Sequence, residues 1–494
     1  MLVLGIVSMT PSTFTIDLFL YDLYQGLGNS SEQVKQNRRH FWQRIYPQVT
    51  SEQLAQFQQR EESSFSNYIN LLGSEKIQPL NSPLNGYYYP VKLGDSYGLM
   101  IDCSGEKEND AWGQLPVTVR LEKTKNWIEE HRHGQPGFFG ESWLVWTQLT
   151  DPNQSPEDVA QTFYRAVNIM PQPDWKRDLV GQGAWSGATV FELERPDYTR
   201  DGKNRCYHVL LLCFAANQSP EDVNAATEEL YPNLMVLFHA RNKVLWLYEQ
   251  SWQLKHCLLH ASEDIQKVVA SISPSGLSTK PALLHTSPHD SQQFKALSAD
   301  RHSPNYDLLR MQASLTEALS ISEQYSRNLS YLQEEISAIE INRKNYKDQV
   351  EALQEPDQSA DLEFLDHFGK FALETCLEQV RSDYQAFQVG LQPLANFIST
   401  VSGITEIEKA KNERFLNRTV AIASVGISVA SLAASTFTEQ AKTIIEVRNP
   451  TPSGQPIPVS NAIKSAGLAF GVSLAIGLLG ACMTWLLLKA WNRR

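Results

Sequence analysis

Cysteine, net positive charge and recognisable catalytic signatures are all scarce in this chain of 494 residues. The six cysteines include no C-x-x-C pair and are too few for a disulfide framework, so we expect reduced thiols. Lys and Arg number 43 against 55 Asp and Glu, a net charge of −12. Nucleic-acid-binding proteins concentrate positive charge, so no nucleic-acid partner is expected.

Sequence signatures of nucleotide binding and of common hydrolases are also missing. No Walker-type G-x-x-x-x-G-K-[ST] occurs, and GQGAWSG at 181–187 has the wrong spacing for a dinucleotide fingerprint. The nucleophile motif G-x-S-x-G and the zinc motif H-E-x-x-H are absent as well. We therefore expect a protein that is not an enzyme, with no resident cofactor and no catalytic residues.

Two pairs of histidines have the four-residue spacing with which one helical face can chelate a metal ion. His256 and His260 flank Cys257 on an expected helix, and His285 and His289 fall in a segment rich in Ser and Pro. Neither pair has an evident third ligand. We therefore predict no metal site at either pair.

The amino-terminal part of the chain changes character near residue 80. Residues 1–80 are expected to be a helical segment, with helices that open at Ser31 and Ser51. Residues 84–272 are expected to form an α+β sheet domain, because short apolar runs alternate there with turn-forming residues. One hairpin is expected where residues 241–243 join two apolar runs. The predicted strands are 87–93, 97–102, 141–149, 187–194, 206–215, 234–240 and 244–250.

An internal duplication lies within this sheet domain. The sequence NQSPEDV occurs at Asn153–Val159 and again at Asn217–Val223, each time between a strand-like and a helical run. In each copy a serine, Ser155 or Ser219, can cap a helix, and the acidic pair then lies at the positive end of the helix dipole. The repeat therefore predicts a strand-to-helix junction used twice. A catalytic carboxylate pair is the alternative, but capping accounts for every residue.

A long helical hairpin is predicted beyond a linker at residues 273–304. From Leu308 to Leu353 apolar residues recur with heptad spacing, interrupted only at Ser322 and Arg343, and this is typical of a helix packed on another helix. After a break near Pro356 the spacing resumes. Residues 305–418 are thus expected to be an acidic coiled-coil stalk whose second arm is one long helix.

Two transmembrane helices are predicted to follow. Residues 466–488 form a continuous uncharged apolar run long enough to cross a bilayer. Residues 419–437 are uncharged too but rich in Gly, Ala, Ser and Thr, and a buried soluble helix is the alternative there. Positive residues flank the pair on both outer sides, so residues 438–465 are expected outside and the basic tail 489–494 inside. Gly467 and Gly471 form a G-x-x-x-G motif for helix packing.

These parts together predict the fold class. An α+β cytosolic domain with an internal βα duplication precedes a long helical hairpin stalk and two transmembrane α-helices. The expected location is the inner or plasma membrane, with both termini in the cytoplasm. The lipid bilayer and further copies of the chain are the expected partners, because such a long stalk needs helices to pack against.

The order of parts over roughly the last 190 residues resembles the CorA-type magnesium channel family. The resemblance implies an oligomer whose first span lines a pore for Mg²⁺ or another divalent cation. The Gly-Met-Asn signature of that family is absent, since residues 435–438 read Ser-Thr-Phe-Thr. If the chain conducts ions, the stripe of serines at helical spacing is expected to line the pore: Ser424, Ser428, Ser431 and Ser435.

Two functions of different class follow from these features. The first is a membrane-anchored cytosolic sensor or scaffold protein, held by the coiled-coil stalk and the two spans. The alternative is a CorA-like oligomeric divalent-cation channel or transporter, gated by its cytosolic domain.

Overall fold

The structure is a computed structural model, and its described residues fall into two compact units. The first unit lies within residues 1–259 and 331–388, and the second within residues 260–330 and 389–494. The described residues are 13–26, 29–62, 66–107, 110–133, 136–198, 204–272, 308–355 and 359–390, together with 396, 398 and 399.

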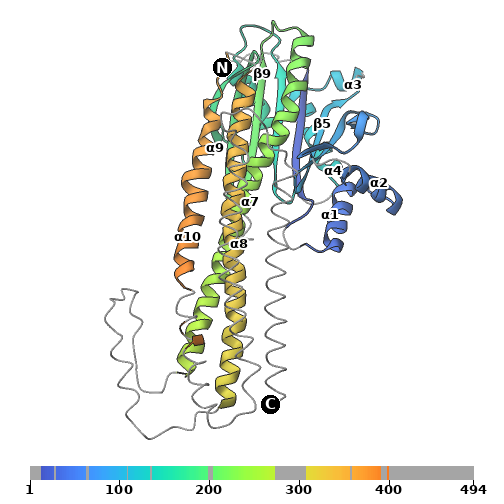
Figure 1. Cartoon of the computed structure of the whole chain (residues 1–494). Coiled ribbons are helices and arrows are strands. Elements are labelled where there is room, and N and C mark those ends of the chain that lie inside the picture. Colours follow the sequence, from blue (N-terminus) through green and yellow to red (C-terminus); the bar gives the residue numbers. More distant parts are fainter. Residues whose placement is uncertain are drawn as a thin grey trace, which may run out of the picture. The chain divides into compact units, whose positions relative to one another are not determined.

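The first unit is built on a mixed sheet with the strand order β2-β4-β5-β1-β6-β9-β8-β7, and β3 pairs with β4 (Figure 1). β6 and β9 run parallel, and the other neighbours pair antiparallel. The strands are β1 (Phe14–Leu23), β2 (Tyr68–Asn70), β3 (Gln78–Pro79), β4 (Leu84–Leu93), β5 (Ser96–Glu106), β6 (Gly140–Gln148), β7 (Leu179–Trp185), β8 (Ala188–Tyr198) and β9 (Asn204–Phe214).

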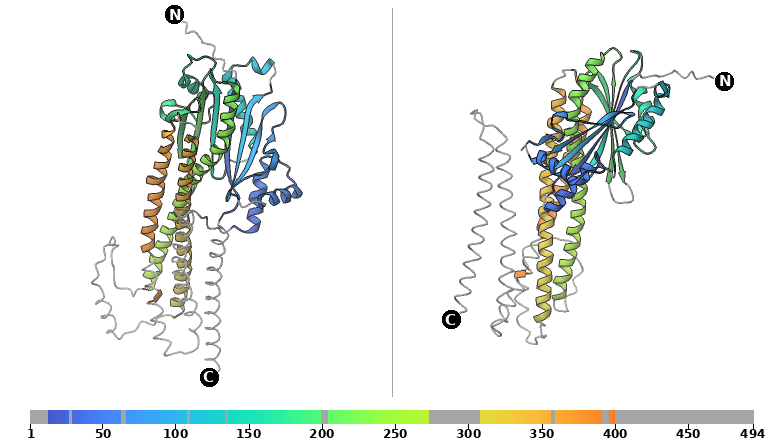
Figure 2. Two further views of the ribbon diagram at one scale, coloured as in Figure 1. Left: turned by 45° about the horizontal axis from the view of Figure 1, so that its top comes forward. Right: turned by 90° about the vertical axis from the view of Figure 1, so that its right-hand side faces the viewer.

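Helices cover both faces of this sheet. α4 and α5 contact one face, whereas α7 lies on the other, as the right-hand view of Figure 2 shows. α1 packs beside β1, where Phe41 stacks on Tyr97 of β5 with ring centroids 4.2 Å apart. The helices along this part of the chain are α1 (Ser31–Gln43), α2 (Ser51–Glu62), η1 (Gly73–Glu75), α3 (Asp110–Gly113), α4 (Val117–His131), α5 (Pro156–Val167), α6 (Trp175–Asp178) and α7 (Pro220–Ile272).

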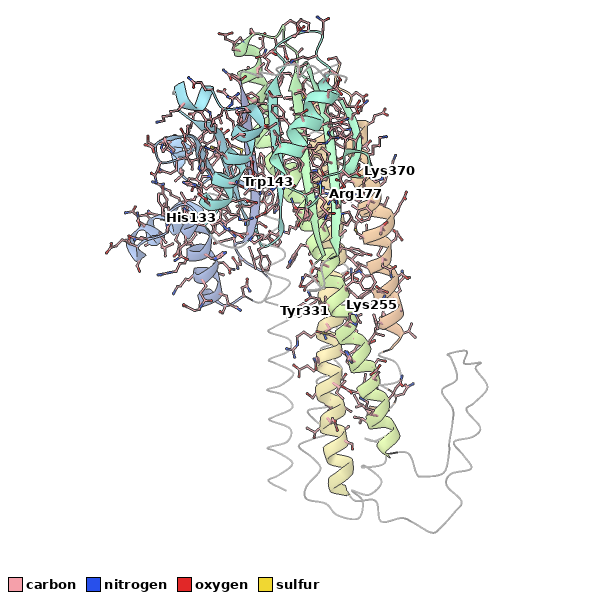
Figure 3. All side chains as sticks on the ribbon, turned by 180° about the vertical axis from the view of Figure 1, so that it is seen from behind. His133, Trp143, Arg177, Lys255, Tyr331 and Lys370 are labelled. Atoms are coloured by element: carbon pink, nitrogen blue, oxygen red, sulfur yellow. The ribbon has the colours of Figure 1, made fainter. Side chains whose placement is uncertain are left out.

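Further helices pack along α7 within the first unit. Lys255 of α7 binds Asp383 of α10 at 2.8 Å, and Figure 3 shows Lys255 between these two helices. Arg381 of α10 binds Glu340 of α8 at 3.3 Å. These contacts make α7, α8 and α10 a helical bundle. The helices after α7 are α8 (Leu308–Gln354), η3 (Glu363–Leu365), α9 (Asp366–Phe371), the π-helix η4 (Ala372–Leu377) and α10 (Glu378–Val389).

The heptad pattern of α8 is confirmed by burial. In the second unit its positions Leu315, Ala318, Tyr325 and Leu329 are buried, as are Ala261, Ile265 and Val268 on the last turns of α7. In the first unit the same stripe continues in the buried residues Leu332, Ile336, Ile339, Tyr346, Val350 and Leu353. The apolar period of the sequence therefore marks the covered face of this helix.

Three local predictions in the sheet domain and before it are wrong. The region 1–80 contains a central strand, β1, because its alternating residues fill both faces of the sheet. The hairpin expected at residues 241–243 is the middle of α7, and its polar residues are buried against the sheet rather than forming a turn. The caps of α1 and α2 lie one residue earlier than expected, at Ser30 and Thr50.

The second arm of the predicted hairpin also differs from one long helix. It starts as the short helices η3 and α9 and passes through a π-helical turn before α10. Such turns commonly replace regular α-helix where a side chain must be re-aimed, and the buried residues Ala372, Cys376 and Leu377 lie in this one. Pro393, where a kink was expected, lies outside the described residues.

The membrane part of the predicted fold class is corrected. Within the described part of the chain, no helix combines the length and apolar character needed to cross a membrane. α7 and α8 are long enough, but charged residues recur along both of them. Two transmembrane helices, and with them an integral membrane protein, are not supported. The segments on which that prediction was based lie outside the described residues, as does the linker: 273–304, 419–437, 438–465, 466–488 and 489–494.

Candidate functional site

The two faces of the sheet differ in chemistry. Strand residues alternate between faces, so neighbours in sequence have opposite surroundings. The face toward α4 and α5 is apolar, with Ile16, Leu18 and Leu20 of β1 in one continuous core. The face toward α7 carries polar residues that are buried or partly buried. We call this set the polar layer, and its sheet residues are Asp17, Asp102, Ser142, Glu192, Glu194, Cys206 and His208.

Two glycines let α7 approach the polar layer closely. A side chain at Gly98 of β5 would meet the Met235 sulfur of α7 at 2.8 Å. A side chain at Gly140 of β6 would meet the Asn242 amide oxygen at 2.6 Å, and its φ of +132° also favours glycine. Tyr21 of β1 donates its hydroxyl to the Met235 carbonyl at 2.9 Å. The two glycines therefore leave room for α7 to pack closely on the sheet, and the Tyr21 hydroxyl bonds the helix to it.

The first cluster of the polar layer is a pair of carboxyl groups. Asp17 of β1 and Asp102 of β5 are direct cross-strand partners, and both are buried. Tyr231 of α7 donates its hydroxyl to Asp102 Oδ2 at 3.4 Å and accepts from the Trp146 indole at 3.0 Å. Burial raises the pKa of Asp17 well above its ordinary value, and the nearby Asp102 raises it further. Burial also raises the pKa of Asp102 to about 6.

The second cluster joins a serine, a histidine and a glutamate. His208 Nδ1 lies 3.0 Å from Ser142 Oγ, and His208 Nε2 lies 3.1 Å from Glu192 Oε1. The Asn242 side-chain amide of α7 donates to the same Ser142 Oγ at 2.9 Å. Burial raises the pKa of Glu192 to about 8. It lowers the pKa of His208 well below its ordinary value. At neutral pH the protonated Glu192 therefore donates to a neutral His208.

This second cluster contains the residue types of a hydrolase triad but not its working arrangement. A triad serine faces Nε2 of its histidine and is reached by substrate. Here Ser142 faces Nδ1, and Ser142, His208 and Glu192 are at most 1% exposed. Asn242 occupies the side of the serine that a substrate would need. The cluster therefore acts as an internal hydrogen-bonded link between the sheet and α7.

The third cluster surrounds a buried arginine. Arg241 of α7 is fully buried and binds Glu194 of β8 at 2.8 Å, and it lies 3.5 Å from the Cys206 sulfur. Its guanidinium also lies 5.0 Å from the ring centre of Phe368 of α9. The nearby Arg241 charge holds the pKa of Glu194 near 2 although burial opposes it. An ion pair of this burial orders both partners, because either charge alone would be costly.

The helices after α8 are attached to the edge strand of the sheet. The Trp185 indole of β7 donates to the Leu353 carbonyl of α8 at 2.9 Å. Asp361 forms an antiparallel bridge with Ala184, with hydrogen bonds of 2.8 and 3.0 Å. Covering the edge in this way removes unpaired backbone groups that would invite aggregation. The sheet is thus connected to the bundle at α7 and at β7.

The candidate site residues predicted from the sequence do not lie in the polar layer. His256 and Cys257 are exposed on α7, and so is His260. No group of three metal-ligating side chains occurs among the described residues. Several predicted residues lie outside the described part: His285, His289, Ser424, Ser428, Ser431, Ser435, Gly467 and Gly471.

The repeated NQSPEDV sequence has the structural role predicted for it. Ser155 caps α5 by accepting from the Asp158 amide at 3.3 Å. Ser219 caps α7 by accepting from the Asp222 amide at 3.1 Å. The copies follow the parallel neighbours β6 and β9, yet α5 and α7 cover opposite faces of the sheet.

Sequence reasoning missed the polar layer, although a signal for it was present. Polar residues stand inside apolar strand runs, as Asp17 does in FTIDLFLYDL and His208 in CYHVLLLCFA. Their alternation with apolar neighbours places them on one face once the strands are known. Which strands are neighbours decides which polar residues meet.

Comparison of the chain with protein-family models, curated proteins and solved structures found no match.

Proposed function

We propose that the chain is a non-enzymatic sensor or scaffold protein. In this proposal the sheet domain receives a protein partner or a signal, and α7, α8 and α10 carry the resulting change to the rest of the chain. The observation that supports it is the single helix α7, which forms the second face of the sheet and continues as part of the bundle. The polar layer fixes the position of α7 on the sheet, because each buried polar group needs its hydrogen-bonding or ionic partner.

The bundle contacts are suited to transmission. Gln349 of α8 donates to Asn233 of α7 at 2.7 Å, close to where α7 covers the Asp17 pair. Lys255 binds Asp383 further along the same helix. A shift of α7 on the sheet would therefore have to be followed by its neighbours. The channel alternative depends on membrane spans, and we do not propose it.

Coupling between the sheet and the bundle is the testable core of this proposal. Phe238→Leu removes ring contacts on the α7 face, where Phe238 packs on Phe19 and His208 with centroids 5.2 and 5.0 Å apart. We expect a loss of about 1 kcal/mol in unfolding free energy. Hydrogen exchange of the full chain should then rise in residues 332–350 of α8 and in α10, as well as in α7.

The matched control is Phe163→Leu, which makes the same change on the opposite face. Phe163 of α5 is 2% exposed and packs on Phe14 with centroids 6.2 Å apart. Its exchange increase should be confined to α4, α5 and the adjoining strands. Equal effects of the two variants on α8 and α10 would contradict directed coupling through α7.

A further inference from the structure

Two carboxyl groups face each other beneath α7, and none of the described residues that surround them is a cation. Asp17 and Asp102 are direct partners across β1 and β5. Neither oxygen of the Asp17 side chain makes a hydrogen bond of good geometry among the described residues, and the Tyr231 hydroxyl is the one nearby donor that lowers its pKa against the larger effect of burial. A fully buried carboxylate without a donor is among the costliest arrangements in a protein interior. The arrangement is satisfied when one of the two carboxyl groups carries a proton and donates it to the other.

The surroundings of the pair contain acids and phenols. α7 contributes Tyr231 and the negative charge of Glu228, and β4 contributes Tyr87, whose pKa is raised by burial and by the acidic groups Asp102, Asp17 and Glu228. β6 contributes the Trp146 indole, which bonds the Tyr231 hydroxyl. None of these groups is a cation. A second negative charge in this site would therefore be opposed by every acidic neighbour as well as by burial.

The Asp17 and Asp102 pair lies where it can control the packing of α7 on the sheet. Tyr231 of α7 connects Asp102 with Trp146, so this hydroxyl sits directly on the pair. One turn further along, Met235 occupies the space above Gly98 and receives the Tyr21 hydroxyl. Ionisation of both carboxyl groups would require water, and water enters only if this part of α7 moves off the sheet.

We propose that Asp17 and Asp102 form a proton-dependent latch that holds the first part of α7 on the sheet. The latch is closed while the pair holds a proton, and it opens when both groups are ionised. The latch controls the coupling of the sheet to the helical bundle through α7, and it rests on the proposed function for its biological use.

The sign of the pH dependence follows from proton linkage. The closed state binds a proton that the open state releases, because solvent-exposed aspartates ionise at low pH. Raising the pH therefore favours the open state. The opening equilibrium should increase by up to about tenfold per pH unit while one proton is released.

The test is hydrogen exchange of the full chain at several pH values between 6 and 9, evaluated as protection factors that remove the intrinsic pH effect. In the wild type, protection of residues 224–236 should fall as the pH rises. Asp17→Asn keeps the shape and supplies an amide donor to Asp102 but cannot ionise, so its protection should fall less steeply, and what fall remains is that expected from Glu192. Asp264→Asn, at an exposed carboxylate on the same helix, should behave as the wild type.

A second measurement does not depend on helix opening. Infrared difference spectra of the wild type at neutral pH should contain the stretching band of a protonated carboxyl group that Asp17→Asn lacks. If Asp17→Asn does not fold, Asp102→Asn provides the same comparison, because its amide can donate to Asp17.

Three outcomes would overturn the latch. The first is an equal pH slope in the wild type and Asp17→Asn, and the second is a carboxyl band of the same intensity in both proteins, since Glu192 contributes such a band to each. The third is a gain in protection from Mg²⁺ that a chelator reverses and Asp17→Asn abolishes, since the pair would then hold a cation instead of a proton. A pH slope in α7 that leaves α8 and α10 unchanged would keep the latch and contradict only the proposed coupling.

Discussion

At the scale of single residues, the chain places a set of interacting titratable groups on the α7 side of the sheet, where most of them are buried. Burial holds Glu192 and His208 in their neutral forms, whereas Arg241 and Glu194 are both charged and form an ion pair. Glu192 and Glu194 both lie on β8, His208 lies on the neighbouring strand β9, and Arg241 comes from α7. Such mixed networks specify one arrangement of α7, because a shifted helix would leave charges unpaired.

The Glu192 carboxyl group predicts a measurable pH dependence of stability. Its pKa is about 8 in the folded protein against an ordinary value of 4.5, so folding favours the protonated form. This stabilisation is fully present below pH 4.5 and is lost as the pH rises toward 8, by at most about 1.4 kcal/mol per pH unit. Glu192→Gln cannot ionise and does not lose this stabilisation. Its unfolding free energy should therefore increase relative to that of the wild type as the pH rises across this range.

Urea unfolding at pH 5, 6, 7 and 8 measures this difference. Glu52→Gln, at an exposed position in the first turn of α2, is the control and should follow the wild type. A Glu192→Gln variant whose stability falls with pH as steeply as that of the wild type would show that Glu192 is already ionised in the folded state.

At the scale of elements, the same seven-residue sequence starts two helices of very different length. α5 ends after 12 residues, where Asn168 adopts a left-handed conformation. α7 continues for 53 residues. The start of a helix is a local matter of capping and dipole, which the repeat supplies twice. Its length depends on what covers its apolar face beyond the sheet.

Removal of either repeated cap should have a similar effect. Ser155→Ala and Ser219→Ala each leave a helix amide without its acceptor, and we expect a loss of about 1 kcal/mol in unfolding free energy for each. Ser31→Ala is the control, because Ser30 caps that helix and Ser31 is its first residue. Urea unfolding at neutral pH checks all three. A loss for Ser31→Ala equal to that of the others would mean that the substitutions act through helix propensity or solvation instead of capping.

At the scale of the whole molecule, the bundle keeps apolar side chains in contact with solvent. Trp252 of α7 is 43% exposed, and on α8 Tyr331 and Ile341 are 40% and 54% exposed (Figure 3 labels Tyr331). Single exposed apolar residues are ordinary. With Leu259 of α7, which is 44% exposed, four of them lie along two packed helices, in keeping with the homo-oligomer expected from the sequence, which stays a prediction.

Light scattering of the purified full chain tests this assembly. We expect a mass that is a multiple of the 55.8 kDa chain, and Ile341→Glu should reduce it because a buried charge would be unpaired at the contact. Lys344→Glu introduces the same residue at an exposed polar position of α8 and should leave the mass unchanged. A wild type that is monomeric at every concentration would contradict the prediction.

The local pattern of the sequence predicted those elements whose signal is contained in neighbouring residues. Short apolar runs bounded by turn-forming residues gave five strands between residues 87 and 215, and heptad spacing gave the buried face of α8. The repeat gave two helix starts. The local sequence pattern gave a wrong prediction for residues 234–250. There, β-branched and aromatic residues on either side of a polar triplet resemble a hairpin. There Arg241 and Asn242 find partners on strands far away in the chain, and those partners make a helix the better solution.

The sequence by itself therefore determined that the chain alternates strands and helices, that a long heptad helix follows, and that capped junctions repeat. Only the tertiary structure decided that β1 lies at the centre of the sheet and that Asp17 meets Asp102. It alone placed His208 between Ser142 and Glu192. The physical reason is that a period of two or of seven residues fixes which face a side chain occupies. The partner on that face comes from a distant strand or helix, and only the packed chain selects it.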